Sequence, residues 1–473
     1  MYPLIQKINN PNGLLVICGA AVFALLVAVA KISPHLGSGT FDRELIPVFI
    51  FFMVAAAAVY LAAVGFLRKN RACSVLLIIL FGLGFRTLFF FSDPILEDDF
   101  HRYFWDGAVV TGGMNPYEHS PGEVARGEGD GELGELRDLY GDTLDRVNHP
   151  HVKTIYPPVA EFFFALSYRI SPMSLTAWRI LLMVFDIATL GLLFATLRKL
   201  CIPLQYSLIY WWNPLLVKEI FNSVHMDVLA FPFVLGAILL FICGRKRLWA
   251  IVLSLAVGVK LWPALLFGMF LSPLRQKKET LIQCLVFTAV LLVIFLPMVA
   301  FKLDSATGVV AYGKSWQNNS PFFAATLSVW ESALNALDIH PGHAQTYSRA
   351  GIIMILLAWK SYVAFAIGSI GIHKKALLII GGAFLLSPAQ FPWYYTWLLP
   401  FLCVAPSPGF LALTALLPLY YLQYYFTPSP PGEGGIFGNM VVWLEFVPVW
   451  VLLAWEWWRF RASKNVNSCQ IQS

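Results

Sequence analysis

Charge is scarce along this chain of 473 residues. Lys, Arg, Asp and Glu make up 13% of it, against about 25% in an average soluble domain, whereas hydrophobic residues make up 58%. This deficit excludes an ordinary soluble globular protein and predicts a non-aqueous environment for much of the chain. The excess of 33 Lys and Arg over 27 Asp and Glu is too slight to indicate nucleic-acid binding.

Paired cysteines and internal repeats are also missing. The seven cysteines include no CxxC pair, and none of them falls in the long polar segment 92–156. The sequence therefore predicts neither a disulfide framework nor a zinc site. It shows no repeat of 20–50 residues and no inverted-repeat symmetry.

Long apolar runs take the place of the missing charge. A bilayer requires about 20 apolar residues per helix. A membrane barrel would instead show alternating segments of about ten residues. The runs therefore predict an all-α polytopic membrane protein of about 12–13 transmembrane helices. The expected spans are 14–32, 46–67, 73–91, 177–197, 203–217, 226–243, 280–301, 349–371, 375–389, 393–405, 409–426 and 440–458.

Clusters of basic residues predict the orientation of these spans. Basic residues favour the cytoplasmic side of a membrane. With every cluster placed there, both termini are cytoplasmic and segments 33–45, 92–156, 302–348 and 427–438 are external. The orientation requires that 157–171 does not cross, and that 248–271 enters and leaves on one side, broken near Lys260 and Pro263. The clusters lie at 68–71, 198–199, 245–247, 275–278, 373–375 and 459–464.

The polar segment after the third expected span begins with three consecutive acids, Glu97, Asp98 and Asp99. Neighbouring carboxylates raise one another's pKa. Such a group can act as a base toward a hydroxyl or hold a cation. The alternative is a helix N-cap that interacts with the helix dipole. Further along, 122–145 is rich in Gly and acids and predicts a solvated loop.

Several motifs follow the three acids in a fixed order. They resemble motifs of the bacterial GT-C glycosyltransferases, polytopic enzymes that are mostly mannosyltransferases and use polyprenyl-phosphate sugars. The resemblance covers roughly residues 92–400. The motifs are EDDFHRYFWDG, GGMNPY, VNHP and TIYPP within 97–158, then Asn213-Pro214, Lys218-Glu219, His225-Met226-Asp227, Lys260 with Pro263, Tyr312 with Trp316 and Asn319, and Pro392-Trp393-Tyr394.

The resemblance implies an inverting GT-C-like hexosyltransferase in the bacterial inner (plasma) membrane, with its active site on the external face. It would move a single sugar, with mannose expected, from a polyprenyl-phosphate donor to a lipid or glycan acceptor. Asp99 best matches the catalytic base of the family, and Asp98 is the second choice. No cofactor is expected, although Asp98 and Asp99 could together hold a divalent cation.

Other residues are candidates for binding substrate. Cationic side chains on the external side could stabilise the leaving phosphate, although Arg102 and Lys153 could equally be snorkelling at the membrane interface. Trp393 and Tyr394 could stack on a sugar or anchor the interface, and a structural role is favoured for Lys260. The predicted substrate-binding residues are Arg102, Tyr103, Asp106, Asn115, Tyr117, Lys153, Tyr156, Lys218, His225, Asp227, Trp393 and Tyr394.

The resemblance also divides the chain. Residues 1–72 lie outside it, 73–405 form the catalytic membrane core with external loops 92–156 and 302–348, 406–458 form C-terminal membrane helices, and 459–473 form a cytoplasmic tail. A transporter or flippase of a lipid-linked sugar remains an alternative, although such a protein should carry acids near mid-membrane. A relative that transfers whole glycans is a weaker third option, since no segment could form a large external domain.

Overall fold

The computed structural model describes residues 11–37, 42–69, 73–129, 131–245, 247–271, 277–300, 307–368, 370–426 and 435–470. Some predictions fall partly outside these residues: basic clusters at 70–71, 246 and 275–276, external segments at 38–41, 302–306 and 427–434, and the tail at 471–473. The structure is 79% helical, and its described residues contain no strand.

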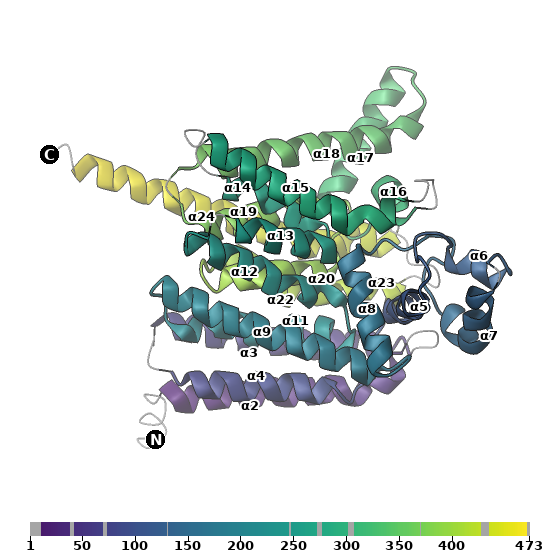
Figure 1. The fold of residues 1–473 in the computed structure, drawn as a ribbon. Helices are drawn as coiled ribbons and strands as arrows, with labels where there is room; N and C mark the ends of the chain where they lie inside the picture. Colours follow the sequence, from purple (N-terminus) through teal and green to yellow (C-terminus); the bar gives the residue numbers. More distant parts are fainter. Residues whose placement is uncertain are drawn as a thin grey trace.

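Long apolar helices lie side by side and form a bundle, with the two chain termini at the same end (Figure 1). Six helical segments of the described chain are long and apolar enough to cross a membrane. The prediction of an all-α polytopic membrane protein is therefore confirmed. The helices concerned are α2 (Pro11–Ile32), α3 (Leu45–Lys69), α9 (Leu175–Lys199), α15 (Lys277–Val299), α18 (Ala344–Ser361) and α24 (Val442–Gln470). Shorter apolar helices complete the bundle: α4 (Val75–Phe89), α13 (Leu248–Val259) and α19 (Ile372–Leu386).

Three apolar runs that predicted continuous spans are instead chains of short helices, so that prediction is wrong for 203–217, 393–405 and 409–426. Proline occupies an N-terminal position in many of the pieces, where it lacks the N–H that a continuing helix needs. The pieces are η2 (Leu204–Ser207), α10 (Leu208–Trp211), α11 (Pro214–Val217), α20 (Pro392–Tyr395), η9 (Thr396–Leu398), α21 (Leu399–Leu402), α22 (Pro408–Leu416), η10 (Leu417–Tyr421) and α23 (Leu422–Phe426).

Two breaks in apolar helices place polar residues inside the bundle. A bend of 101° separates α11 and η3 (Lys218–Asn222) from η4 (Met226–Ala230) and α12 (Phe231–Ile242), and Val224 at the bend has a φ of 57°. The second break follows α13, where Lys260 is extended before η5 (Trp262–Leu266) and α14 (Phe267–Phe270). This break lies where the sequence predicted it.

Short helices at the end of the bundle opposite the termini carry the first polar segment (Figure 1). They are α5 (Phe100–Thr111), α6 (Pro121–Ala125), α7 (Glu132–Leu144) and α8 (Pro158–Ile170). At 13 residues, α8 is about 20 Å long, too short to span a bilayer. A Cβ on Gly107 would lie 2.6 Å from the Phe164 carbonyl oxygen, so this glycine lets α5 pack closely on α8.

The segment 122–145 was predicted to be a solvated loop, and this is wrong because much of it is helical. Leu133 and Leu144 pack with Trp105 in a small apolar core, and this burial stabilises α7. The second polar segment carries α16 (Gly308–Ser315) and α17 (Pro321–Ala336) at the same end of the molecule (Figure 1).

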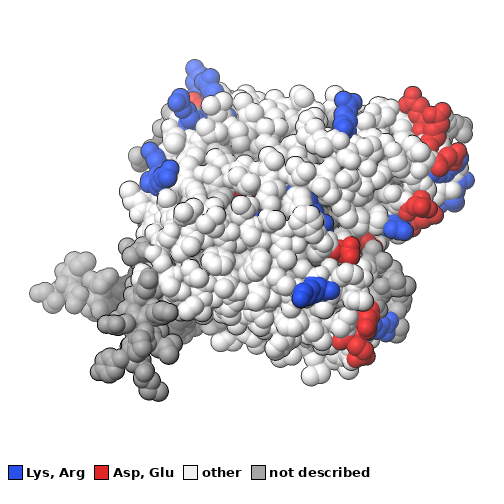
Figure 2. Space-filling model, turned by 90° about the horizontal axis from the view of Figure 1, so that it is seen from below, with Lys and Arg blue, Asp and Glu red and all other residues white. Residues whose placement is uncertain are grey.

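Charged side chains gather at the two ends of the bundle. Figure 2 shows a broad uncharged surface between them, with Asp and Glu concentrated at the end that carries α5–α7. Lys and Arg lie at both ends, and at the end with the termini they are nearly the only charged residues visible in this view. An apolar belt between two polar ends is the surface that a bilayer requires of a membrane protein.

Candidate active site

Asp99 lies immediately before α5, and its side chain does not cap that helix. The Asp99 backbone carbonyl accepts the Arg102 backbone N–H at 3.0 Å, whereas the Asp99 carboxylate makes no bond to the helix N-terminus and lies 3.6 Å from His225 Nδ1. The side chain is 30% exposed. The N-cap alternative considered from the sequence is therefore not the role of this carboxylate.

His225 occupies the bend between η3 and η4, and its side chain is fully buried. Its Nε2 atom lies 3.7 Å from Glu219 Oε2 and 3.9 Å from Glu97 Oε2. The Trp393 ring stacks on the imidazole with centroids 3.9 Å apart. One histidine thus brings together carboxylates from the first polar segment and from a broken membrane helix.

Asp227 and Lys260 form an ion pair beside this histidine. The distance from Lys260 Nζ to Asp227 Oδ1 is 2.6 Å, and the Trp397 indole N–H donates to the same oxygen at 2.5 Å. The Lys260 side chain is 17% exposed, whereas that of Asp227 is 1% exposed. Lys260 is therefore a cation that keeps access to the surface of the site.

Lys218 and Glu219 form a second, deeper pair. Lys218 Nζ donates to the Tyr421 hydroxyl and lies 3.4 Å from Glu219 Oε1, and Tyr421 donates to that oxygen at 2.9 Å. Both side chains of the pair have no exposed area. The ammonium of Lys218 balances the negative charge of Glu219 inside the protein, and its contacts with Tyr421 and Glu219 leave it without access to the surface.

Five carboxylates lie near His225 and outnumber the two lysines, Lys218 and Lys260. We define these five residues as the acid cluster: Glu97, Asp98, Asp99, Glu219 and Asp227. Burial raises the pKa of Asp99 to about 6; the negative charge of Asp98 adds to the shift, and the positive charge of Lys260 opposes it. Burial also raises the pKa of Asp98 and Glu97. Among the described residues, Glu97 Oε1, Glu219 Oε2 and Asp227 Oδ2 have no hydrogen-bond donor. Perturbed, unsatisfied carboxylates of this kind are typical of functional sites.

A comparison of the chain with known protein families identifies the family to which it belongs. The MptA_B family, described as "Alpha-(1->6)-mannopyranosyltransferase, N-terminal domain", matches residues 13–274, more than half of the chain. The chain belongs to this mannosyltransferase family. It is accordingly a hexosyltransferase of a GT-C-like kind. No curated protein and no solved structure matches it. The matched region includes α2 and α3 and carries all five carboxylates of the acid cluster.

The structure brings both candidates for the catalytic base, Asp99 and Asp98, together in the acid cluster. Three of the predicted substrate-binding residues lie there too: Lys218, His225 and Asp227. Tyr103 and Tyr156 lie against each other with ring centroids 5.2 Å apart, close enough to Asp99 for its charge to act on both. Together they form an aromatic wall beside the base candidate.

Arg102 stabilises the loop that covers the site. Its guanidinium donates to the backbone carbonyls of Asn148, His149 and Val152 at 3.4, 3.2 and 2.9 Å. The Asn148 side-chain amide in turn donates to Asp98. The arginine that was predicted to bind phosphate therefore positions segment 148–152, and through Asn148 it orients one of the acids.

Trp393 and Tyr394 are packed among other aromatic side chains. Trp393 stacks on Phe391 at 4.5 Å as well as on His225, and it is 7% exposed. The Tyr394 ring stacks on Trp397 at 4.4 Å and lies 4.9 Å from Lys260 Nζ. These contacts position the histidine and the lysine of the site.

Other predicted residues lie away from the acid cluster, mostly in the loops between the outer helices. Asn115 donates to the Pro297 carbonyl at 3.0 Å, and the Tyr117 hydroxyl donates to the Tyr156 carbonyl at 2.6 Å. Lys153 lies close enough to Glu123 for their charges to interact. Asp106 faces a separate pocket, described below.

Sequence reasoning did not include Glu97, Glu219, Asn148 or Lys260 among the site residues. Each belongs to a motif that the sequence displayed, and Lys260 was assigned a structural role. Their convergence depends on the two helix breaks, because each break directs a polar side chain into the bundle. Among the described residues no group of three or more His, Cys, Asp and Glu is arranged to hold a metal ion.

Proposed function

We propose that this transferase moves one mannose from a polyprenyl-phosphate donor to a hydroxyl of a lipid or glycan acceptor, with inversion at the anomeric carbon. The observation that carries the proposal is the Asp99 carboxylate. It is partly exposed, makes no helix cap, and lies 3.6 Å from a buried histidine within an excess of carboxylates. Family membership supports mannose as the sugar.

The proposed reaction is a single displacement. Asp99 accepts the proton of the acceptor hydroxyl while the acceptor oxygen forms a bond to the anomeric carbon. The bond from that carbon to the phosphate oxygen breaks, and the polyprenyl phosphate leaves with the electron pair. A pKa of about 6 leaves Asp99 mostly ionised at neutral pH and still basic enough to accept a proton.

Lys260 is the residue we propose for stabilising the leaving phosphate. Its ammonium is partly exposed and lies near enough to Asp99 to affect its ionisation. Lys218, by contrast, is wholly buried and bound to Tyr421 and Glu219. A positive charge held in place by Asp227 and aromatic rings needs little reorganisation when negative charge develops on the phosphate.

The distribution of charge supports an active site on the external face of a bacterial inner (plasma) membrane. The termini share one end of the bundle with basic residues, and the acid cluster lies toward the other end, where α5 begins (Figures 1 and 2). Under the positive-inside rule, the end with the termini is cytoplasmic. The acceptor would then meet the donor on the external side.

Metal dependence remains a prediction. No cofactor is expected, since the proposed base and the proposed cation both come from the chain. If a divalent cation between Asp98 and Asp99 were required instead, chelation would abolish transfer and added Mg²⁺ or Mn²⁺ would restore it.

The test is a transfer assay with purified protein in nanodiscs, a polyprenyl-phosphate [¹⁴C]mannose donor and a lipid extract as acceptor source. We expect a labelled product whose new linkage is inverted relative to the donor. Asp99→Asn should lose the activity, whereas Asp138→Asn, a change at a 72% exposed residue of α7, should keep it. The proposal fails if the wild-type protein forms no glycosidic bond with any polyprenyl-phosphate mannose, or if Asp99→Asn is fully active.

A further inference from the structure

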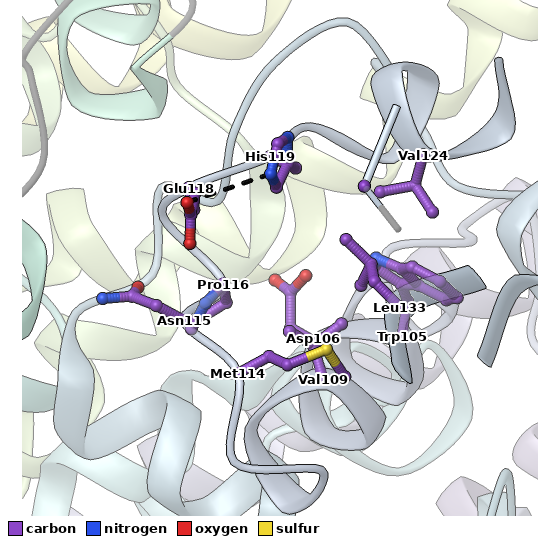
Figure 3. Close-up of a pocket in the computed structure, with 11 residues that line it drawn as sticks. Trp105, Asp106, Val109, Met114, Asn115, Pro116, Glu118, His119, Val124 and Leu133 are labelled. Carbon is purple, nitrogen blue, oxygen red and sulfur yellow. Dashed lines mark ion pairs between the residues drawn. The ribbon is translucent and has the colours of Figure 1, made fainter. Parts of the chain in front are cut away.

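A pocket of about 230 Å³ lies among the outer helices, separate from the acid cluster. It is enclosed by α5, the turn at 114–119, α6 and the start of α7 (Figure 3). Its volume is below the usual range for ligand pockets, about 300–1,000 Å³. It is suited to one small ligand and not to a lipid chain.

Asp106 points into this pocket from α5 (Figure 3). The residue is 2% exposed, and among the described residues its Oδ2 atom has no hydrogen-bond donor. A buried carboxylate that lacks a donor is costly, so an unsatisfied carboxylate that lines a pocket points to a ligand that supplies the missing donor.

The surroundings of Asp106 keep its carboxylate in place. Burial raises the pKa of Asp106 to about 6, while the charge of Arg102 and a hydrogen bond from Thr154 oppose the shift. The Thr154 hydroxyl has a single proton, which it donates to Glu161 at 2.8 Å, so it cannot satisfy both carboxylates at once. The protein therefore satisfies the Asp106 carboxylate only in part.

The rest of the pocket combines an apolar wall with a polar rim. Glu118 and His119 lie on the rim with 4.0 Å between Glu118 Oε1 and His119 Nε2, and their side chains are 49% and 35% exposed. Asn115 also lines the pocket (Figure 3). The apolar wall consists of Trp105, Val109, Met114, Pro116, Val124 and Leu133.

The carboxylates and the apolar wall of the pocket together indicate which class of ligand fits it. Two carboxylates, Asp106 and Glu118, disfavour a phosphate or any other anion. Hydroxyl groups, which donate hydrogen bonds, match the acceptor atoms of these carboxylates. The C–H face of a small ring could pack on the apolar wall, as in ligand sites where a few polar groups fix the orientation. A neutral polyhydroxylated ring meets all of these conditions.

We infer that this pocket is a sugar-binding subsite that holds one hexose residue of the acceptor. The identification of the ligand as part of the acceptor rests on the proposed function. Asp99 and Asp106 are seven residues apart on one side of α5, which places them about 10 Å apart along the helix axis. A glycan bound at Asp106 could therefore extend toward the base.

The test measures binding directly, without transfer. The full chain in nanodiscs would be titrated with α-(1→6)-linked mannotriose, with maltotriose as a second ligand, and binding followed by calorimetry and saturation-transfer NMR. We expect saturable binding of the mannoside, weakened about tenfold or more in Asp106→Asn and in Glu118→Gln, since each loses a charge-assisted hydrogen bond. Asp138→Asn, outside the pocket, should bind like the wild type.

If Asp106→Asn fails to fold, Glu118→Gln still tests the inference. Glu118 is half exposed, so its substitution should not affect folding. Equal binding by the wild type and Glu118→Gln, or no binding of either trisaccharide by the wild type, would overturn the inference. Binding of Ca²⁺ in place of the sugar, abolished by Asp106→Asn, would also overturn it.

The two proposals can fail independently. Asp99→Asn should still bind the mannoside, since Asp99 does not line the pocket. If the wild type binds the sugar but forms no product, the proposed function fails and the subsite remains. If transfer proceeds with the KM for acceptor unchanged in Glu118→Gln, the subsite fails and the proposed function remains.

Discussion

Two of the buried groups of charged residues in the bundle are built differently. One is the ion pair of Arg86 and Asp186, between α4 and α9. The other is the acid cluster around His225. Both lie among apolar helices where an unpaired charge is costly. Their difference lies in how completely the carboxylates are satisfied, since Arg86 Nη2 also has no acceptor among the described residues.

In the first group the carboxylate is fully bonded. Asp186 accepts Arg86 Nε at one oxygen and the Tyr210 hydroxyl at the other. Arg86 Nη1 donates to the carbonyls of Gly82 and Trp211 at 2.9 and 2.7 Å, and its guanidinium lies 3.5 Å above the Trp211 ring. One cation balances one anion, both side chains have no exposed area, and this pair ties α4, α9 and α10 together.

In the second group five carboxylates share two lysines, and three carboxylate oxygens have no hydrogen-bond donor among the described residues. Asp99 also keeps 30% of its side chain exposed. A balanced, closed pair stabilises the fold, whereas an unbalanced and partly open cluster costs stability and retains reactivity. The comparison supports a structural role for the first group and agrees with the catalytic role proposed for the second.

The largest effect should come from Asp99→Asn. The amide keeps the shape of the side chain but is not a base, so kcat/KM for transfer should fall by about 10³-fold, within the range attributed to general bases. Purified variant and wild type would be compared in the nanodisc assay, with Asp138→Asn as the matched control. A loss of less than fivefold would remove Asp99 from the role of base.

Breaking the closed pair should affect stability. Asp186→Asn and Arg86→Met each leave one buried charge uncompensated, and each should lower the free energy of unfolding by about 3–5 kcal/mol. Chemical denaturation in detergent, followed by intrinsic tryptophan fluorescence, measures the change. The double variant Arg86→Met/Asp186→Leu should recover part of the loss. Wild-type stability in both single variants would contradict a structural role.

The pH dependence of the transfer rate should show the ionisation of Asp99 in the acid cluster. A base must be ionised, so kcat/KM should rise with pH and level off above an apparent pKa of about 6, the pKa of Asp99. Below that value the rate should fall about tenfold per pH unit. A rate that stays constant between pH 4.5 and 7.5 would show that no carboxylate of this pKa takes part.

The smallest effect is a gain of stability in the inactive variant. Because the pKa of Asp99 is raised from its usual value near 3.9 to about 6, the folded state binds this proton more tightly than the unfolded state. Its contribution to stability is therefore present at low pH and is lost as the pH rises through about 6.

Asp99→Asn removes that loss. With allowance for the 30% exposure of the side chain, the variant should be more stable than wild type by about 1–2 kcal/mol at pH 7.5, and by about half as much at pH 5. Thermal unfolding in nanodiscs at the two pH values measures the difference. A variant less stable than wild type at pH 7.5 would show that ionised Asp99 is well compensated in the folded state.

The parts of the site that could be predicted are those with local signals. Three acids after a membrane span indicated Asp99, and the ordered motifs indicated His225 and Asp227. The contacts of Arg102 could not be predicted, since nothing local shows that its guanidinium reaches the carbonyls of 148–152. The ion pair of Lys260 could not be predicted either, because its partner Asp227 is 33 residues away in sequence.

The helices of the fold also divide into those that local sequence signals predicted and those that they did not. Apolar length predicted the uninterrupted helices, because a bilayer imposes about 20 residues per crossing. It did not predict the broken segments at 203–217, 393–405 and 409–426, where neighbouring helices must accept the backbone groups that each interruption leaves unpaired.

By itself the sequence determined that this chain is a helical membrane protein with three consecutive acids just after an apolar span, because hydropathy and neighbouring charge are local properties. The tertiary structure decided which charges meet. It brought Glu97, Asp99, Glu219 and Asp227 around one histidine, and left Asp106 in a separate pocket. The physical reason is that a side chain's partners depend on where helices break and pack, and those breaks are stabilised by residues more than a hundred positions away.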